Sequence, residues 1–255
     1  MTGIFATPRD VTDVDACHFY HSIELPGLGL CEGRWDLRHG MDRYLPDLEY
    51  SGATVLDIGA ANGFVTFDLE RRGASVIALD QADGVGLDRV PYPDLDTAAA
   101  TAGEVGVIDG LKNGFWLAHR RLGSRARAVY ADAEDLPSAL GPVDVAFMGN
   151  ILQHLRDPLA AVAKAASLAR QVVITEAFWR SDFDPDEPLL FFLPALRDGE
   201  PSGAKCHSWW QVSAGMAARW LEVLGLRVEQ RYLHEQRHVF GDARVPHYTV
   251  VASWP

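Results

Sequence analysis

The stretch TVLDIGAANGF, Thr54 to Phe64, reads as a short apolar strand that runs directly into a glycine loop. Asp57 lies just before the first glycine, and the run that follows, VTFDLERRGASVIALD, ends on a second acid, Asp80. In an open α/β sheet, ligands bind outside the carboxyl ends of the strands, close to the first crossover. The two carboxylates are therefore expected to flank a ligand site.

The composition of this loop indicates which ligand it can accept. A dinucleotide site has the pattern G-x-G-x-x-G, in which the second glycine lets the backbone approach a pyrophosphate. Here the loop is GAANG, residues 59–63, and it lacks that second glycine. Asp57 would also direct a carboxylate toward the place of the phosphate. Both features favour a cationic nucleoside ligand without phosphate groups.

The middle of the chain alternates short β-like runs with helical runs, which is typical of a parallel sheet with helices on both faces. The expected strands are residues 54–59, 75–80, 126–132, 143–150 and 171–178, and the expected helices lie around residues 63–72, 112–122 and 157–169. Further on, residues 213–225 read as a helix with Ser213 at its N-cap. Residues 226–234 and 247–254 are expected to form an antiparallel hairpin at the sheet edge.

The predicted fold is therefore α/β, with a Rossmann-like, mostly parallel seven-stranded sheet that carries helices on both faces and ends in an antiparallel hairpin. Residues 1–50, which are rich in aromatic side chains and histidine, are expected to form an N-terminal cap over the strand ends. The ligand-binding domain is predicted at 51–255. Within it, residues 179–208 contain several prolines and clustered acids and are expected to form an irregular, inserted lid.

The charge balance limits the possible partners. The 255 residues include 23 basic and 35 acidic side chains, a net charge of −12. Contacts to several phosphates need a clustered basic surface, so the balance argues against DNA and, more weakly, against tRNA. The start of the chain lacks a signal-peptide core, no run of about 18 apolar residues occurs, and the three cysteines are far apart. We expect a cytoplasmic protein with a small-molecule partner, no membrane contact and no structural metal site, in an oligomeric state that the sequence leaves open.

The stretch VLDIGAANGF, followed by the LD that ends at Asp80, resembles the first two motifs of class I S-adenosylmethionine-dependent methyltransferases. The resemblance implies S-adenosyl-L-methionine as cofactor, a cationic nucleoside. It also implies that Asp57 supports the loop and the methionine amino group, and that Asp80 accepts both ribose hydroxyls. The cofactor contacts that it predicts here are Asp57, Gly59, Ala60, Gly63, Asp80 and Gln81.

Two later stretches extend the resemblance over about residues 50–178. YADAEDLP is similar to the segment that grips adenine, which implies contacts from Asp132 and Ala133. DVAFMGNILQHLRDP is similar to the fourth motif, which implies a cofactor contact from Asn150. The same stretch, with KNGFWLAHRRLGS before it and HSWWQVSAGM after it, also resembles the branch that includes the tRNA wobble-uridine carboxymethyltransferases. Because this chain is short and acidic, we take from that branch the methyl-transfer scaffold and not the tRNA substrate.

In methyl transfer the cofactor supplies the activated methyl group, and the protein supplies alignment, exclusion of water and, for a hydroxyl acceptor, a base. His154 is the predicted base, because it follows the fourth strand; the alternative is a histidine that closes a helix N-terminus or packs on the sheet. The predicted substrate contacts are His18, Tyr20, His21, Trp35 and Trp209. For the aromatic residues among them, packing of the cap on the sheet is the alternative.

The leading hypothesis is a methyltransferase acting on an oxygen or nitrogen of a small molecule. Three alternatives stay open: a tRNA-modifying methyl or carboxymethyl transferase, a nucleotide-binding oxidoreductase with a degenerate fingerprint, and a catalytically silent cofactor-binding module. The acceptor cannot be read from the sequence, because the cap and the 179–208 segment would shape its pocket.

Overall fold

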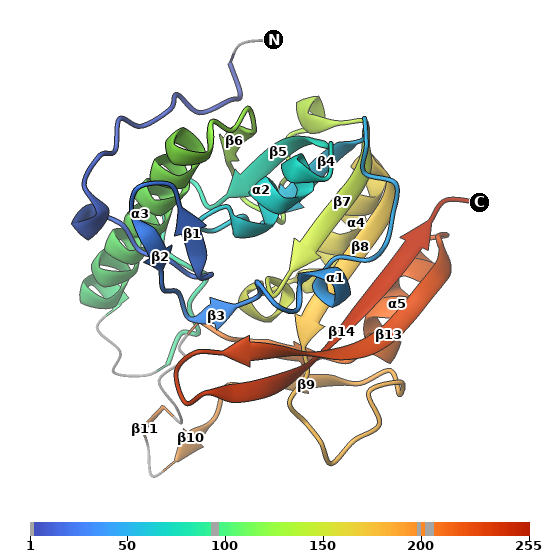
Figure 1. Cartoon of the computed structure of the whole chain (residues 1–255). Helices are drawn as coiled ribbons and strands as arrows, with labels where there is room; N and C mark the ends of the chain where they lie inside the picture. Colours follow the sequence, from blue (N-terminus) through green and yellow to red (C-terminus); the bar gives the residue numbers. More distant parts are fainter. Residues whose placement is uncertain (1–2, 93–96, 198–199, 202–206) are drawn as a thin grey trace.

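The central sheet of the computed structural model has eight strands in the order β3-β13-β14-β8-β7-β4-β5-β6 (Figure 1). The structure describes residues 3–92, 97–197, 200–201 and 207–255. The parallel strands are β4 (Thr54–Ile58), β5 (Ser75–Asp80), β6 (Arg127–Tyr130), β7 (Val143–Gly149) and β8 (Ala169–Ala177). The hairpin of β13 (Arg227–His238) and β14 (Ala243–Ser253) joins this sheet antiparallel to β8. The predicted α/β fold with a mostly parallel sheet and a terminal hairpin is confirmed.

The strand count differs by one from the expected seven. β3 (Trp35–Asp36) comes from the N-terminal segment and pairs with the outer edge of β13. β13 runs four residues beyond the expected end at His234, so it offers an edge on which a short strand can pair. The backbone amide of Val239 adds a bond to the carbonyl of Arg34 at 2.8 Å. The N-terminal segment is thus tied to the hairpin edge.

Helices cover both faces of the sheet. They are α1 (Met41–Tyr44), α2 (Phe64–Arg71), α3 (Thr97–Leu122), α4 (Pro158–Leu168) and α5 (Ala214–Val223). Successive side chains of a strand point to opposite faces: Leu56 and Ile58 join the core beneath α4 and α5, and Val55 joins the core beneath α1 and α2. Ser213 caps α5 by accepting a bond from the amide of Met216, which confirms the predicted N-cap.

Helix α3 is much longer than the expected residues 112–122. Gly110 and Gly114 lie inside it. Because glycine has a low helix propensity, the part of the helix before residue 112 was not predicted. Their role is close packing: a Cβ on Gly110 would lie 2.5 Å from Nδ1 of His18, and one on Gly114 would lie 2.4 Å from the His18 carbonyl. The N-terminal segment therefore crosses α3 at these two glycines.

Short ladders replace much of the irregular structure expected near the lid. β9 (Leu190–Phe192) pairs with β12 (Trp210–Val212), and β10 (Leu196–Arg197) pairs with β11 (Glu200–Pro201). The N-terminal segment adds a hairpin of β1 (Ile23–Leu25) and β2 (Gly29–Cys31) that the sequence did not predict. Single-turn 3-10 helices occur at η1 (Val14–Ala16), η2 (Ser138–Leu140) and η3 (Leu152–His154). Within the described part of the chain, no helix is long and apolar enough to cross a membrane.

Candidate active site

The glycine loop is held tightly at the carboxyl ends of β4 and β5. The amides of Gly59 and Ala60 both donate to the carbonyl of Leu79, at 2.8 and 3.0 Å. Gly59 and Gly63 have φ angles of +85° and +82°, a region that glycine adopts without strain. A Cβ on Gly59 would also lie 2.9 Å from Cδ1 of Ile151, which follows β7. The loop therefore requires glycine both for its turn and for its approach to the end of β7.

Asp80 ends β5 beside this loop, as the sequence predicted. One carboxylate oxygen accepts from the amide of Ala61 at 2.6 Å, and the other accepts from the amide of Gln81 at 2.7 Å. Burial raises the pKa of Asp80, while these two amides and the charge of Lys112 oppose the rise. Each carboxylate oxygen can accept more than one hydrogen bond. The fixed carboxylate can thus still accept the two hydroxyls of a ribose.

Asp57 lies deeper, near the end of β4, and is 2% exposed. Its carboxylate accepts from the Thr66 hydroxyl of α2 at 2.6 Å. Burial raises the pKa of Asp57 to about 7, and the negative charge of Asp80 adds to the rise. A positive group bound at the loop would favour ionised Asp57. The electrostatics therefore suit a cationic ligand.

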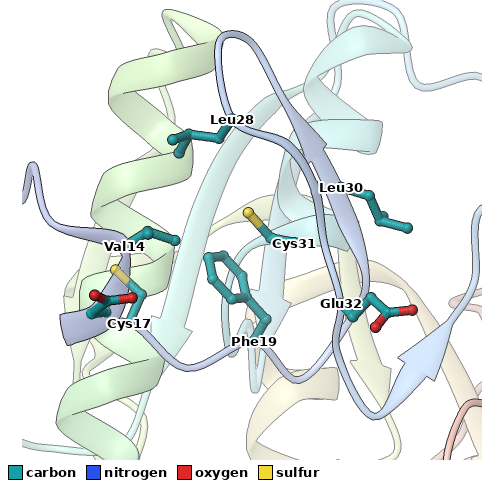
Figure 2. Close-up of a pocket in the computed structure, with 8 residues that line it drawn as sticks. Val14, Cys17, Phe19, Leu28, Leu30, Cys31 and Glu32 are labelled. Carbon is teal, nitrogen blue, oxygen red and sulfur yellow. The ribbon is translucent and has the colours of Figure 1, made fainter.

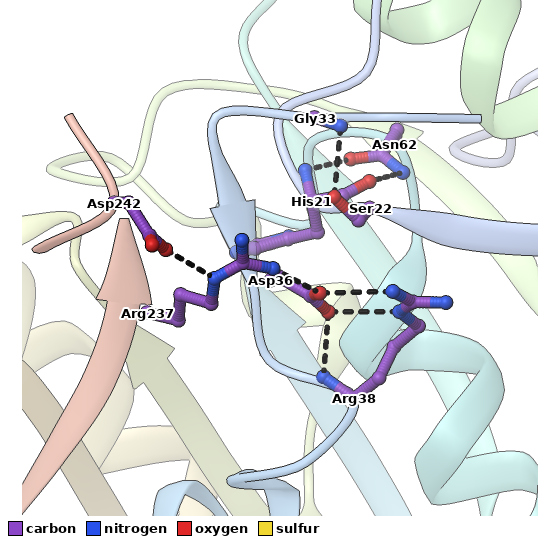
Figure 3. A network of polar contacts seen from close by, with 8 residues as sticks. All are labelled: His21, Ser22, Gly33, Asp36, Arg38, Asn62, Arg237 and Asp242. Carbon is purple, nitrogen blue, oxygen red and sulfur yellow. Dashed lines mark hydrogen bonds and ion pairs between the residues drawn. The ribbon is translucent and has the colours of Figure 1, made fainter. Parts of the chain in front are cut away.

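Asn62 of the glycine loop is a functional candidate that the sequence analysis missed. It is fully buried, and its carbonyl oxygen accepts from the amides of Tyr20 and His21 at 3.0 and 2.8 Å. Its amide group donates back to the His21 carbonyl at 3.0 Å (Figure 3). The loop thereby holds the N-terminal segment directly beside the strand ends. The only hint in the sequence is a polar residue within an otherwise small-residue loop.

A second anchor lies further along the same segment (Figure 3). Buried Asp36 accepts two bonds from the guanidinium of Arg38, at 2.8 and 2.9 Å, and Arg237 of β13 approaches it at 3.4 Å. The Arg38 bond holds the pKa of Asp36 below its usual range. These contacts fix the segment to the hairpin.

The predicted substrate residues fall into separate groups. Tyr20, His21 and Trp35 lie together: the Trp35 indole donates to the Tyr20 hydroxyl at 3.2 Å, and the Tyr20 and His21 rings are 4.9 Å apart. His18 lies instead against α3, where its amide donates to the carbonyl of Gly110. Trp209 is buried, and its indole donates to the carbonyl of Asp88 at 2.9 Å.

His154 lies in η3, beyond the end of β7, as its sequence position predicted. Its Nδ1 is 2.9 Å from the carbonyl of His207, and the two rings are 5.2 Å apart. The amide of Trp209 donates to the carbonyl of the adjacent Gln153. His154 and Trp209 therefore lie at one junction, where the segment after the predicted lid contacts η3.

The remaining predicted cofactor residues differ in their surroundings. Asp132 is exposed and accepts from the amide of Glu134 at 2.8 Å, while Ala133 is buried. Asn150 is buried, its carbonyl oxygen accepts from the amide of Ala177, and its nitrogen lies 3.2 Å from Nε2 of His247. The Asn150 side chain thus links the ends of β7 and β8 to His247 within β14. If Asn150 contacts the cofactor as predicted, its side chain must do so while it also makes these two contacts.

Lys112 of α3 is another residue that the sequence analysis missed. Its side chain is 2% exposed, its Nζ lies 4.0 Å from the centre of the Tyr130 ring, and it pairs with Asp83 at 2.6 Å. Its charge lowers the pKa of Asp80. The lysine therefore lies at the end of the loop where Asp80 and the predicted adenine segment meet.

A separate hollow of about 510 Å³ lies in the N-terminal segment (Figure 2). Burial raises the pKa of its Cys17 thiol to about 11, so that thiol is a poor nucleophile. The lining residues are Val14, Asp15, Cys17, Phe19, Leu28, Leu30, Cys31 and Glu32, none of which the sequence predicted as a site residue.

Comparisons with known proteins agree with this architecture. No protein-family model matches the sequence. A stretch of 67 residues is 42% identical to magnesium-protoporphyrin O-methyltransferase of Rhodobacter capsulatus, covering 25% of this chain and 29% of that enzyme. The chain thus matches less than a third of the length of this curated relative.

Two solved structures show the fold. The N-terminal domain of EvdMO1, determined with S-adenosylhomocysteine and D-fucose, has a TM-score of 0.50 at 17% identity, covering 94% of this chain and 93% of that one. An S-adenosylmethionine-dependent methyltransferase from Methanosarcina mazei has a TM-score of 0.50 at 15% identity, covering 86% and 98%. The chain has the fold of S-adenosylmethionine-dependent methyltransferases. The finer likeness to the tRNA wobble-uridine branch stays a prediction.

Proposed function

We propose that the chain transfers a methyl group from S-adenosylmethionine to an oxygen or nitrogen of a small molecule. The observation that supports this most directly is the geometry of Asp80. Backbone amides on both sides hold its carboxylate at the end of β5, beside a glycine loop with buried Asp57 beneath it. A nucleoside cation without phosphates suits this pair of acids, and a dinucleotide does not.

The proposed cofactor contacts follow the order of the strands. Asp80 and Gln81 hold the ribose, and Asp57 supports the loop and the amino group. Asp132 and Ala133, after β6, face the adenine. Gly59, Ala60 and Gly63 supply the close backbone approach, and Asn150 shapes the end of β7. When bound, the cofactor supplies the activated methyl group; these residues orient it.

The acceptor is proposed to bind under the N-terminal segment, next to Tyr20, His21 and Trp35. Asn62 supports this placement, because it fixes the backbone of Tyr20 and His21 against the loop. His154 is the base that the sequence suggests. Its Nδ1 lies 2.9 Å from the His207 carbonyl, which fixes the orientation of the ring.

We propose that residues 1–50 form a cap and that residues 179–208 form a lid on a domain of residues 51–255. The contacts of Asn62 support the cap. For the lid, the bond between the amide of Leu193 and the carbonyl of Trp209 connects it to the segment that touches η3.

A small-molecule acceptor fits the neighbours better than tRNA does. One match is a magnesium-protoporphyrin O-methyltransferase and another structure was determined with D-fucose, and both compounds are small molecules. The net charge of −12 also opposes binding to a polyanion. Methylation of bulk tRNA by the purified protein would overturn this part of the proposal.

Calorimetry tests the cofactor assignment. The wild-type protein should bind S-adenosylhomocysteine and not NAD, and Asp80→Ala should weaken that binding by about 1.5–3 kcal/mol, the range for hydrogen bonds to a charged group. The matched control is Asp144→Ala. Its carboxylate also accepts a hydrogen bond from a backbone amide, that of Thr54 at 2.8 Å, but it lies at the amino ends of the parallel strands. Unchanged affinity in a folded Asp80→Ala variant would refute the assignment.

A further inference from the structure

Glu176 is a buried acid at the strand ends that none of the roles above uses. It is the next-to-last residue of β8 and is 3% exposed. One of its carboxylate oxygens accepts from the amide of Leu152 at 2.7 Å, just beyond β7. Burial raises its pKa to about 8, against the effect of the Leu152 and Ile151 amides. The carboxyl group therefore lies between the ends of β7 and β8.

Polar groups without a partner occur on the elements around this carboxyl. The hydroxyls of Tyr44 and Tyr248 and both ring nitrogens of His21 are buried and have no hydrogen-bond partner among the residues that the structure describes. Burial raises the pKa of both tyrosines, and the nearby Glu176 carboxylate raises it further. Buried polar atoms are nearly always paired in folded proteins, with protein groups, water or ligand. We refer to Glu176, Tyr44, Tyr248 and His21 as the Glu176 cluster.

The Glu176 cluster borders the proposed cofactor site. Asn62 of the glycine loop holds His21, and a Cβ on Gly149, the last residue of β7, would lie 2.7 Å from the Tyr44 hydroxyl. Ile151, which precedes the amide bound by Glu176, packs against Gly59 of the loop. The Glu176 cluster thus lies where the loop and the ends of β7 and β8 meet.

We propose that the Glu176 cluster binds the methyl acceptor, and that Glu176 takes the proton which a hydroxyl or amine acceptor loses on methylation. The proposal rests on the proposed function. The acceptor heteroatom bonds to the methyl carbon, the carbon–sulfur bond breaks with its electron pair on sulfur, and the acceptor's proton passes to a Glu176 oxygen. Tyr44, Tyr248 and His21 then satisfy their hydrogen bonds on the acceptor.

Ionised Glu176 would also stabilise the positive sulfur of the cofactor, which S-adenosylhomocysteine lacks. This difference can be measured without knowing the acceptor. Between about pH 6 and about pH 9, Tyr20, Tyr44 and Tyr248 stay neutral because burial raises their pKa. His21 also stays neutral, because burial lowers its pKa to about 3. Within the cluster, Glu176 alone changes charge over this interval.

The experiment is calorimetry of both ligands, S-adenosylmethionine and S-adenosylhomocysteine, across that interval. The ratio of their affinities for the wild-type protein should rise about tenfold or more toward high pH in favour of the methylated ligand. Asp57 titrates nearby, and the sulfonium makes the amino group of S-adenosylmethionine the more acidic of the two, but Glu176→Gln keeps Asp57 and so shares this contribution. In Glu176→Gln the rise of the ratio should be lost, with S-adenosylhomocysteine affinity unchanged.

The control variant is Glu70→Gln. Glu70 also accepts one backbone amide, from Arg125 at 2.7 Å, but it lies at the far end of α2 and should keep the wild-type rise. The same pH dependence of the ratio in the wild type and in Glu176→Gln would overturn the proposal. Failure of the wild-type protein to bind S-adenosylhomocysteine would instead refute the proposed function itself.

A second measurement separates Glu176 from His154. The probe is methyl-labelled S-adenosylmethionine with a low-molecular-weight extract of the cells that make the protein. Glu176→Gln should reduce label transfer by about 100-fold or more, the usual scale for loss of a general base, while the control Glu70→Gln should retain the wild-type level. Wild-type label transfer by Glu176→Gln would refute the base role of Glu176 and leave His154 as the candidate.

Discussion

Replacing Glu176 with glutamine should make folding stability less sensitive to pH. Glutamine keeps an oxygen that can accept from the Leu152 amide but carries no titratable proton. In the wild-type protein the folded state holds the Glu176 proton up to about pH 8, whereas the unfolded chain releases it near the ordinary value of 4.5. Between these values the unfolded state binds fewer protons, so wild-type stability falls as pH rises.

The size of the effect follows from that interval. One pH unit corresponds to about 1.4 kcal/mol, so the interval from 4.5 to about 8 corresponds to about 5 kcal/mol. The free energy of unfolding of Glu176→Gln, minus that of the wild type, should therefore be constant below about pH 4.5. It should rise by about 1.4 kcal/mol per pH unit from there to about pH 8, and then level off.

Urea unfolding of both proteins across this range measures the difference directly. Asp57, whose pKa burial raises to about 7, adds its own pH dependence, but it does so in both proteins and cancels. A difference that stays constant within about 0.5 kcal/mol between pH 4.5 and 8 would show that Glu176 titrates alike in the folded and unfolded chains, contrary to the reasoning.

Three further substitutions test the glycine loop. Asp57→Ala should weaken S-adenosylhomocysteine binding more than Asp80→Ala does, because it also releases Thr66; equal losses by calorimetry would contradict this. Asn62→Ala should lower the free energy of unfolding by about 2–4 kcal/mol, since it leaves buried amides unpaired, and should speed proteolysis before β4; cleavage at the wild-type rate would argue against the anchor. Gly63→Ala should lower the free energy of unfolding, measured by thermal unfolding, by at least about 1–2 kcal/mol, because its φ is +82° and its new Cβ would lie 2.5 Å from Cε2 of Phe67. The control is Gly52→Ala, which also has a positive φ but no atom within 4 Å of the new Cβ, so it carries the backbone strain without the clash.

The parallel core was predictable because its signals are local. Residues 75–80 were expected as a strand and form β5 with those bounds, and Asp80 ends it beside the glycine loop as predicted. Apolar runs of this length, alternating with helices, suit strands buried on both faces. The glycines of the loop are required by its local backbone conformation, and the acids lie at fixed distances in sequence from it. The positions of both could therefore be predicted from their spacing alone.

Features set by distant parts of the chain were not predictable in this way. Gly110 and Gly114 read as interruptions of a helix, yet the N-terminal segment requires them for its passage over α3. Glu176 reads as an ordinary strand residue in QVVITEAF. It is buried opposite Tyr248 of β14, its partner in the sheet, and it raises the pKa of Tyr44 of α1; both tyrosines lie far away in sequence. Tertiary contacts of this kind leave no periodic signal.

The buried acids connect the two proposals physically. Asp57 lies beneath the glycine loop and Glu176 lies at the ends of β7 and β8, and burial raises the pKa of both toward or above neutrality. An isolated buried carboxylate is unfavourable unless a positive charge compensates it. S-adenosylmethionine carries two positive centres, an amino group and a sulfonium, separated by a short aliphatic chain. Under the two proposals, these acids would form a site that ionises when such a ligand binds, and that loses one of its compensating charges once the methyl group has been transferred. This asymmetry would favour release of the product over the substrate, and it gives the unusual burial of Glu176 a reason beyond structural support.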